Sequence, residues 1–157
     1  AELKNDVTVS DQNWTPQVNL GIAVLIPEKY VEDLNLRMSL YRRISDLEND
    51  EDSDALSAEM IDRFGSLPDE VDALLKVMKI KRLCRKAHVA KVDAGPKGVV
   101  LTMRHEDIKD PSIVMNAITK NSGWRLRPDQ TILVQGNFDT PKARVRGGEK
   151  AVTALIG

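Results

Sequence analysis

Charged side chains surround a break between two helices in the stretch "EMIDRFGSLPDEVDALL", residues 59–75, and they are the first candidates for chemistry. Glu59, Asp62 and Arg63 have the spacing i, i+3 and i+4, which places all three on one face of a helix. This group predicts either an ion pair within the helix or a charged face that docks against a partner. Pairs of carboxylates can also act as general acid and base, but these lie in a loop or at helix starts, where solvation and capping explain them.

Motifs for nucleotide, metal or nucleophilic chemistry are missing from the sequence. It has no G-x-x-x-x-G-K-[ST] loop for the phosphates of a nucleoside triphosphate, and residues 95–98 (GPKG) are better explained as a hairpin turn than as a dinucleotide loop. His88 and His105 are far apart and have no partner cysteine, so they do not predict a zinc site. Cys84 lies on an apolar helix face, which favours a buried, inert thiol over a nucleophile. We therefore expect no catalytic, cofactor-binding or metal-binding residue in this chain.

Basic residues dominate the segment 76–91, which contains seven Lys or Arg and no acid. Such a segment could contact nucleic-acid phosphates, and the candidates for these contacts are Lys79, Arg82, Arg85 and Lys86. Only six residues of the chain are aromatic, and none alternates with the basic residues to form a stacking platform for bases. Cations in the last turns of a helix also complement its dipole. Dipole complementation is the simpler explanation, and a DNA-binding accessory module is the alternative.

Acidic residues dominate the segment 46–72, where eleven Asp or Glu stand against the single Arg63, for a local net charge of −10. A surface of this kind repels DNA and attracts a basic protein surface. The run "ENDEDSD", residues 48–54, is interpreted as a solvated loop. The group of Glu59, Asp62 and Arg63 is the part of the segment that suggests docking.

The whole chain has 157 residues and a formal net charge of −1, which is enough length for one domain with one core. This balance predicts no general attraction to nucleic acid or to an anionic membrane. No apolar run approaches the ~20 residues that span a bilayer, the N-terminus lacks the apolar segment of a signal peptide, and the single Cys84 fits a reducing compartment. We expect a cytoplasmic protein with no membrane partner. The chain begins at Ala1 without methionine, as expected for a piece of a longer protein.

The periodicity of the first half predicts a tail, a strand and a helix. Residues 1–13 are polar and have no sustained periodicity, which predicts a tail or linker. The stretch "VNLGIAVLIP" predicts a strand over residues 18–26. Pro27 then opens a helix expected over residues 28–47, because proline is tolerated in the first turn of a helix.

Two more helices are expected before the sheet. Ser53 or Asp54 can cap the first of them, which ends at Gly65, since glycine readily adopts the conformation of a C-terminal cap. The next helix is expected to start with a capping box formed by Ser66 and Asp69 and to run to about residue 87.

The second half alternates short strand pairs with helices. This pattern predicts the α+β class: an N-terminal strand, three consecutive helices, then a small mixed sheet of short strand pairs with one or two further helices. The expected elements are strands over 88–94 and 98–103, a helix over 111–121, strands over 124–127 and 131–135, and a weakly helical C-terminal tail over 139–157 that is interrupted at Gly147 and Gly148.

Two stretches carry a resemblance to a known family. "VNLGIAVLIPEKYVEDLNLRMSLYRRI" and "EMIDRFGSLPDEVDALL" are similar to the C-terminal domain of the bacterial transcription-repair coupling factors, which are DNA translocases of the superfamily 2 helicase type. The specific elements are the strand that ends at Ile26 and Pro27, the R-x-S-L-Y-R-R-I run of residues 37–44, and the IDRFG-x-LP motif of residues 61–68. The resemblance covers residues 14–103, and more loosely the chain to about residue 136.

The resemblance implies a role within a longer protein. Members of the family use ATP and Mg in their motor domains to push RNA polymerase, stalled at a lesion, off the DNA. They recruit excision repair through a separate domain that binds the A component of excinuclease ABC, which we call the excinuclease-binding domain. Residues 14–138 would be the non-catalytic C-terminal regulatory domain, which folds back on the excinuclease-binding domain of the same protein, hides it and restrains the motor. Residues 1–13 would be the end of the motor or its linker, and residues 139–157 have no match.

The resemblance also implies which residues form the interdomain interface. Through the E-x-x-DR-FG motif this role is carried over to Glu59, Asp62 and Arg63, with Asp69 and Glu70 as weaker candidates. The surface that family members hide includes arginines, which an acidic face would complement. The implied partners are the parent's own excinuclease-binding domain and, indirectly, the A component of excinuclease ABC, RNA polymerase and DNA.

Overall fold

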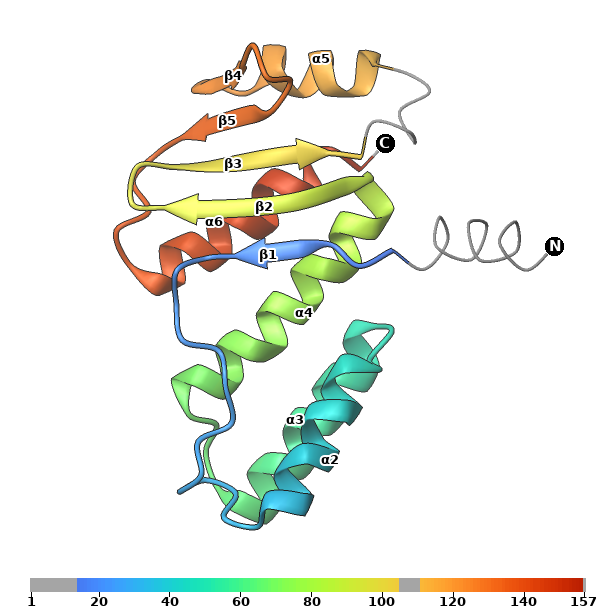
Figure 1. Cartoon of the computed structure of the whole chain (residues 1–157), viewed down its shortest axis with the longest axis vertical. Coiled ribbons are helices and arrows are strands. Elements are labelled where there is room, and N and C mark those ends of the chain that lie inside the picture. The colour runs from blue at the N-terminus through green and yellow to red at the C-terminus, as the bar shows by residue number, and fades with distance from the viewer. Residues whose placement is uncertain (1–13, 105–110, 157) are drawn as a thin grey trace, which may run out of the picture.

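A five-stranded mixed sheet is the centre of the structure, a computed structural model that describes residues 14–104 and 111–156 (Figure 1). Residues 1–13, expected to be a tail or linker, and His105 lie outside the described residues. The strand order is β1-β2-β3-β5-β4, with β1 parallel to β2 and the other neighbours antiparallel. The strands are Gln17–Asn19 (β1), Val89–Gly95 (β2), Gly98–Met103 (β3), Trp124–Leu126 (β4) and Ile132–Gln135 (β5).

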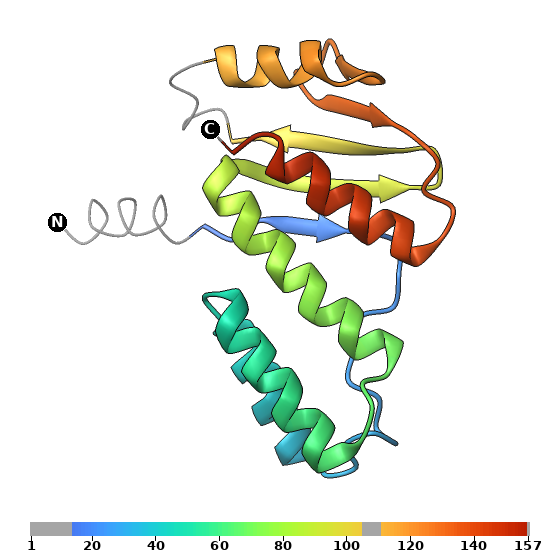
Figure 2. The same ribbon diagram turned by 180° about the vertical axis from the view of Figure 1, so that it is seen from behind.

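Helices cover one face of the sheet. Seen from behind, α4 and α6 cross the same face (Figure 2). None of the described helices covers the face that is toward the viewer in Figure 1. α5 lies beside β4, and α2 and α3 form an antiparallel hairpin next to α4. None of the helices in the described ranges is long and apolar enough to cross a bilayer. The helices are Leu34–Ser45 (α2), Asp50–Phe64 (α3), Asp69–Ala87 (α4), Ser112–Lys120 (α5) and Pro141–Thr153 (α6), and with the sheet they confirm the predicted α+β class.

The first strand is shorter than the predicted 18–26. β1 ends where Asn19 lies opposite Asp93 of β2. The side chain of Asn19 then accepts a hydrogen bond from the N–H of Gly21, whose φ of +64° turns the chain out of the sheet. Arg144 of α6 donates to the Gly21 carbonyl at 3.2 Å. A side chain thus satisfies a backbone group that a longer strand would have paired with a neighbour.

The first helix also starts later than the predicted 28–47. The N–H of Val31 donates to the carbonyl of Pro27 at 3.2 Å, which closes a separate turn before the helix. Asp33 is the N-cap of α2, and its carboxylate accepts a hydrogen bond from the N–H of Leu36 at 2.8 Å. The aspartate therefore sets the start of the helix, and the proline belongs to the preceding turn.

The acidic run 48–54 was predicted to be a loop, which is correct for residues 48 and 49 and wrong for residues 50–54, the start of α3. Asn49 is the N-cap of α3 and accepts a hydrogen bond from the N–H of Asp52 at 2.7 Å. Ser53 and Asp54, the predicted caps, therefore lie within the helix. Carboxylates in a first turn are stabilised by the positive end of the helix dipole, so a run of acids is compatible with a helix start.

The break between α3 and α4 is partly as predicted. Gly65 ends α3 with φ +95°, and its N–H donates to the carbonyl of Ile61 at 2.9 Å. The predicted capping box of Ser66 and Asp69 is wrong, because α4 has Pro68 at its N-cap position and no side-chain capping bond. The C-terminal end of α4 agrees with the prediction, and so does the hairpin of β2 and β3.

The segment 139–157, expected to be a weakly helical tail, contains α6, which packs into the core. Its two glycines do not interrupt the helix. A side chain at Gly147 would clash with the ring of Phe138, and one at Gly148 would lie 3.5 Å from Leu20. Glycine at position 147 is therefore needed for the close approach of Phe138, whereas a Cβ at Gly148 would make an ordinary van der Waals contact. The buried residues of α6 are Val145, Gly148, Ala151 and Val152.

Two hydrophobic cores share α4. The larger core lies between the sheet and the helices α4 and α6, and it includes Ile80 and Leu101. The smaller core lies between α2, α3 and the N-terminal half of α4, and it includes Met60 and Val71. α4 therefore connects the helical hairpin to the sheet as one continuous element.

Candidate protein-interaction surface

Glu59 is held within the α2–α3 hairpin by two arginines. Arg43 of α2 donates hydrogen bonds to both carboxylate oxygens, at 2.7 Å (Nη1–Oε2) and 2.8 Å (Nη2–Oε1), and Arg63 Nη1 donates a third at 3.2 Å. The hydrogen bonds from Arg43, and to a smaller extent the one from Arg63, lower the pKa of Glu59 to about 2. Glu59 therefore joins the two helices, and its oxygens are already engaged within the domain.

Arg63 is also engaged by its neighbours. Its guanidinium lies over the ring of Phe64, 5.0 Å from the centroid, in a cation–π contact. The Phe64 ring in turn contacts Tyr30, with the two centroids 5.7 Å apart. The Tyr30 hydroxyl donates to the carbonyl of Gly65 at 2.8 Å. These contacts fix the end of α3 against the segment that precedes α2.

Asp62 is a helical neighbour of Glu59 on α3 but takes no part in this network. It is exposed, and its side chain forms no hydrogen bond or ion pair with any residue in the described part of the chain. Helical spacing places it opposite the buried Leu56 and Met60, together with exposed residues that include Ile61, whose exposure is 48%. We call this surface the acidic helix face, and it consists of Glu51, Asp54, Ala58, Ile61 and Asp62.

Asp69 and Glu70 begin α4, after the turn that follows α3. Neither makes a hydrogen bond or ion pair within the described ranges, and the structure does not bring them into the network around Glu59. Both carboxylates complement the N-terminal end of the α4 dipole. Their position is compatible with a contact at the edge of a docking surface.

Two of the four candidate nucleic-acid contacts are engaged in ion pairs. Arg82 donates to Asp50 of α3 at 3.1 Å, and only 12% of its side chain is exposed. Lys79 lies 3.1 Å from Glu149 of α6 and 3.6 Å from Asp50. The hydrogen bond from Arg82 lowers the pKa of Asp50, and the one to Glu149 raises the pKa of Lys79. These two cations connect α3, α4 and α6.

The other two candidates, Arg85 and Lys86, are exposed in the last turn of α4. Both complement the negative end of the helix dipole, as the sequence predicted. The basic segment is therefore divided between an internal ion-pair network and two solvated cations.

Side chains with potential for catalysis are few in the described residues. Cys84 is fully buried, and burial raises the pKa of its thiol to about 12, so it is protonated and unreactive at neutral pH. His88 caps the C-terminal end of α4 in the left-handed conformation, with φ +59°. No cluster of three or more potential metal ligands occurs within 14–104 and 111–156.

Sequence reasoning missed Arg43 as the partner of Glu59. The two residues lie at unequal distances from the turn between α2 and α3, so a simple matching of positions across the hairpin would not pair them. Helical side chains lean toward the N-terminus of their own helix. In an antiparallel pair they lean toward each other, which allows this offset pair to meet.

The comparisons with known proteins agree on one family. The model of the TRCF domain matches residues 20–114. A transcription-repair-coupling factor of Rickettsia conorii is 38% identical over 134 residues, which are 85% of this chain and 12% of that protein. The Escherichia coli protein of the same name is 28% identical over 66% of this chain and 9% of its own length. The chain thus spans about a tenth of the length of these relatives.

A solved structure has the same fold. It is the crystal structure of the C-terminal domain of a transcription-repair coupling factor, with a TM-score of 0.68. The match covers 92% of this chain and 96% of the other, at 18% sequence identity. The likeness concerns the fold, and it extends over nearly all of both chains.

Proposed function

The chain belongs to the TRCF domain family, and we propose that it serves transcription-coupled DNA repair as the non-catalytic C-terminal regulatory domain of a transcription-repair coupling factor. In this role it folds back on the excinuclease-binding domain of the same longer protein and masks it. It also restrains the ATP-dependent translocase that removes stalled RNA polymerase from DNA. ATP and Mg²⁺ are held by motor domains outside this chain, and the process takes place in the bacterial cytoplasm.

The acidic helix face is the observation that carries this proposal. Three carboxylates, those of Glu51, Asp54 and Asp62, are exposed there and are not neutralised by any cation in the described part of the chain. The exposed Ile61 adds an apolar side chain beside them. A face of this composition suits a basic protein surface better than a phosphate backbone.

The geometry divides the proposed interface residues into two groups. Asp62 is available to contact the partner domain directly, and Asp69 and Glu70 extend the negative charge beyond the turn. Glu59 acts by holding α3 against α2, because its carboxylate already accepts hydrogen bonds from Arg43 of α2 and from Arg63. We therefore expect Asp62 to have the larger direct effect on docking.

The test uses the full-length protein. Replacing Asp54 and Asp62 by arginine should release the masked domain, raising the affinity for the purified A component of excinuclease ABC and the rate of ATP hydrolysis without RNA polymerase. The matched control is the replacement of Asp46 and Glu48 by arginine, because both are exposed acids in the turn between α2 and α3. The control has the same change in charge and should behave as the parent protein.

Deletion of this domain separates the two parts of the proposal. If deletion raises the affinity for the excinuclease component but the arginine variant does not, the domain masks the site through another surface. If neither change affects this affinity or ATP hydrolysis, the regulatory role is wrong.

A DNA-binding accessory role is the second candidate, favoured by the exposed Arg85 and Lys86. The isolated chain would then bind duplex DNA, and the affinity would fall steeply with salt. With two of the four candidate cations in internal ion pairs, we expect a weak interaction. Replacing Arg85 and Lys86 by glutamine should abolish it, and an unchanged affinity would exclude this helix as the DNA contact.

A further inference from the structure

The sheet has a second surface that the proposed function does not use. None of the helices in the described part of the chain covers its face opposite α4 and α6, which we call the open sheet face (Figure 1). The strand register aligns one row of residues across this face, in the order Asn19, Asp93, Val100, Leu133 and Arg125. Their sequence neighbours on β3 and β5 point to the buried core on the other side. The row therefore presents two aliphatic side chains to the outside at the centre of the sheet.

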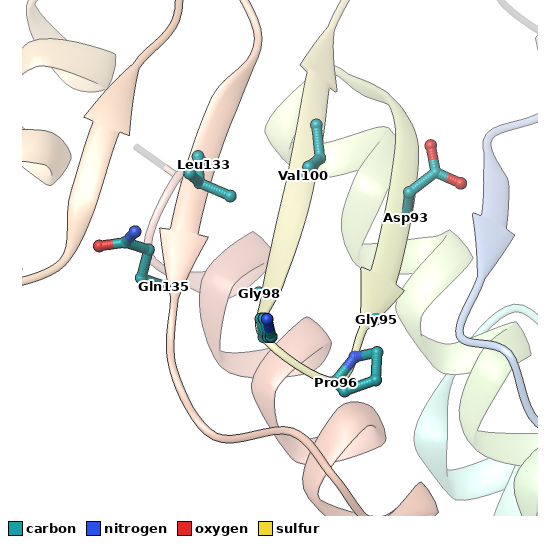
Figure 3. Close-up of a pocket in the computed structure, with 8 residues that line it drawn as sticks. Asp93, Gly95, Pro96, Gly98, Val100, Leu133 and Gln135 are labelled. Atoms are coloured by element: carbon teal, nitrogen blue, oxygen red, sulfur yellow. The ribbon is translucent and has the colours of Figure 1, made fainter.

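A hollow of about 460 Å³ lies beside these aliphatic residues, at the end of the β2–β3 hairpin (Figure 3). Gly95 and Gly98 leave its floor without side chains. Val100 and Leu133 form its apolar wall, and both are only partly buried. Gln135 supplies a polar group on the side of β5. The hollow has room for one large apolar side chain of another molecule.

The charges around the hollow are mainly positive. Asp93 is the one acid of this lining, and it lies 3.4 Å from Lys91 in an ion pair. Lys97 in the hairpin turn and Arg125 on β4 are exposed and form no ion pair in the described part of the chain. Two cations on either side of an apolar centre are therefore available to a ligand. This surface is opposite in sign to the acidic helix face.

We propose that the open sheet face binds an acidic peptide segment of a protein partner, with a large apolar side chain in the hollow and carboxylates on Lys97 and Arg125. Charge complementarity identifies the partner as acidic. The apolar wall favours a peptide, because Val100 and Leu133 offer no partner to a phosphate backbone. The bases of a single strand would need aromatic side chains for stacking, and this lining has none. The proposal does not depend on the proposed regulatory function, since it uses different residues and a partner of opposite charge.

The sheet geometry predicts the spacing of the peptide motif. Val100, Leu133 and Arg125 lie on three successive strands, which are about 4.8 Å apart. Arg125 is thus roughly 10 Å from Val100, which corresponds to about three residues of an extended peptide. The motif is therefore an apolar residue with two acids. One acid lies about three positions away and binds Arg125, and the other lies near the apolar residue and binds Lys97.

In the experiment, the 157-residue chain is the immobilised target, and a displayed library of random short peptides is selected for binding to it. We expect enriched peptides to carry this motif, and the amide chemical shift changes that they cause in the chain to centre on Val100 and Leu133. Replacing Lys97 and Arg125 by glutamate should weaken binding of these peptides about tenfold, because each attraction becomes a repulsion. The matched control replaces Lys142 and Arg146 by glutamate, since both are exposed on α6, behind the sheet.

Several results would overturn the proposal. One is the absence of an enriched motif, and another is equal binding by the sheet variant and the α6 control. Shift changes confined to α3 would place the ligand on the acidic helix face. Single-stranded DNA that displaces the peptides from the same residues would make the face a nucleic-acid surface, and self-association that buries Val100 would make it an interface between copies of the chain.

Discussion

Arg43 of α2 donates two hydrogen bonds to Glu59 of α3, and this bidentate ion pair joins residues sixteen positions apart in the chain. Neither residue lies in the core, so the pair contributes to the orientation of the two helices and buries little apolar surface. A bidentate arginine–carboxylate pair restricts both distance and angle. The pair therefore restricts how α3 lies on α2, in addition to the core that the two helices share, and α3 carries the acidic helix face.

The first prediction concerns pH. The pKa of Glu59 is about 2 in the folded protein, below its ordinary value of 4.5. A lowered pKa means that the unfolded state binds more protons, so the ion pair stabilises the fold fully above pH 4.5 and loses this effect as pH falls toward 2. Glu59→Gln should lower the urea midpoint at neutral pH, and the difference from the parent should shrink through this range.

Glu48→Gln is the matched control for this measurement. Glu48 is exposed in the turn before α3 and has no ion pair in the described ranges. Its urea midpoint should follow that of the parent protein through the acid range. If the Glu59→Gln difference stays constant with pH, the carboxylate is not held by Arg43 in solution.

The local patterns in the sequence were sufficient for the fold class. The periodic apolar residues of α4, the GPKG turn between β2 and β3, and the glycine that ends α3 all appear where they were predicted. These features depend on neighbours in the chain. Helix starts were predicted less well. Pro27, and Ser53 or Asp54, were expected to begin the first two helices, but Asp33 and Asn49 are the N-caps in the structure. Several residues near each start can act as a cap, and packing decides which of them does.

Features that depend on distant residues could not be predicted. The glycines of α6 look like helix breakers in the sequence, but Gly148 packs against Leu20, which is 128 positions earlier. Likewise Arg43 pairs with Glu59 only because α2 packs against α3, and Arg82 pairs with Asp50 only because α4 packs against α3. For the same reason the predicted interface included Glu59, whose charge is used within the domain.

A second prediction concerns the end of α3. Gly65 has φ +95° and ψ −172°, a region that is nearly exclusive to glycine. Gly65→Ala should lower the free energy of unfolding by about 1–3 kcal/mol, measured by urea denaturation. The cause is the backbone conformation alone, because a Cβ atom at this position would meet nothing within 4 Å.

Gly95→Ala is the control for the effect of conformation. A Cβ at Gly95 also meets nothing within 4 Å, and its φ is not positive. The substitution should change the free energy of unfolding by less than about 0.5 kcal/mol. Equal losses in the two variants would mean that the strained backbone at Gly65 is absent in solution.

A third prediction concerns the ion pairs that link α3 to α4. Asp50→Asn removes the charge that pairs with Arg82 and Lys79. Asp50 is mostly exposed, so the loss of stability should be small, about 0.2–1 kcal/mol. The sharper measurement is hydrogen exchange, in which the first turn of α3 should exchange faster. Glu51→Gln is in the same turn without such a partner, and similar exchange in both variants would count against the link.

The last prediction concerns the C-terminal end of the chain. Leu155 follows α6 and is only 3% exposed, within the larger core. Leu155→Ala should lower the free energy of unfolding by about 2–5 kcal/mol, because it leaves a cavity between α6 and the sheet. Leu34→Ala makes the same change at a side chain that is 58% exposed, and should cost less than about 0.5 kcal/mol.

Truncation after residue 138 gives a second measurement of the same packing. Without α6, the buried face of β2 and β3 would be exposed on one side, and the shortened chain should bind the dye ANS and lose its sharp thermal transition. If residues 139–157 were instead the weakly helical tail that the sequence predicted, their removal would change neither ANS binding nor the thermal transition. If Leu155→Ala and the truncated chain unfold as cooperatively as the parent, α6 does not belong to the core, and the contacts of Gly148 with Leu20 and Ile80 do not form in solution.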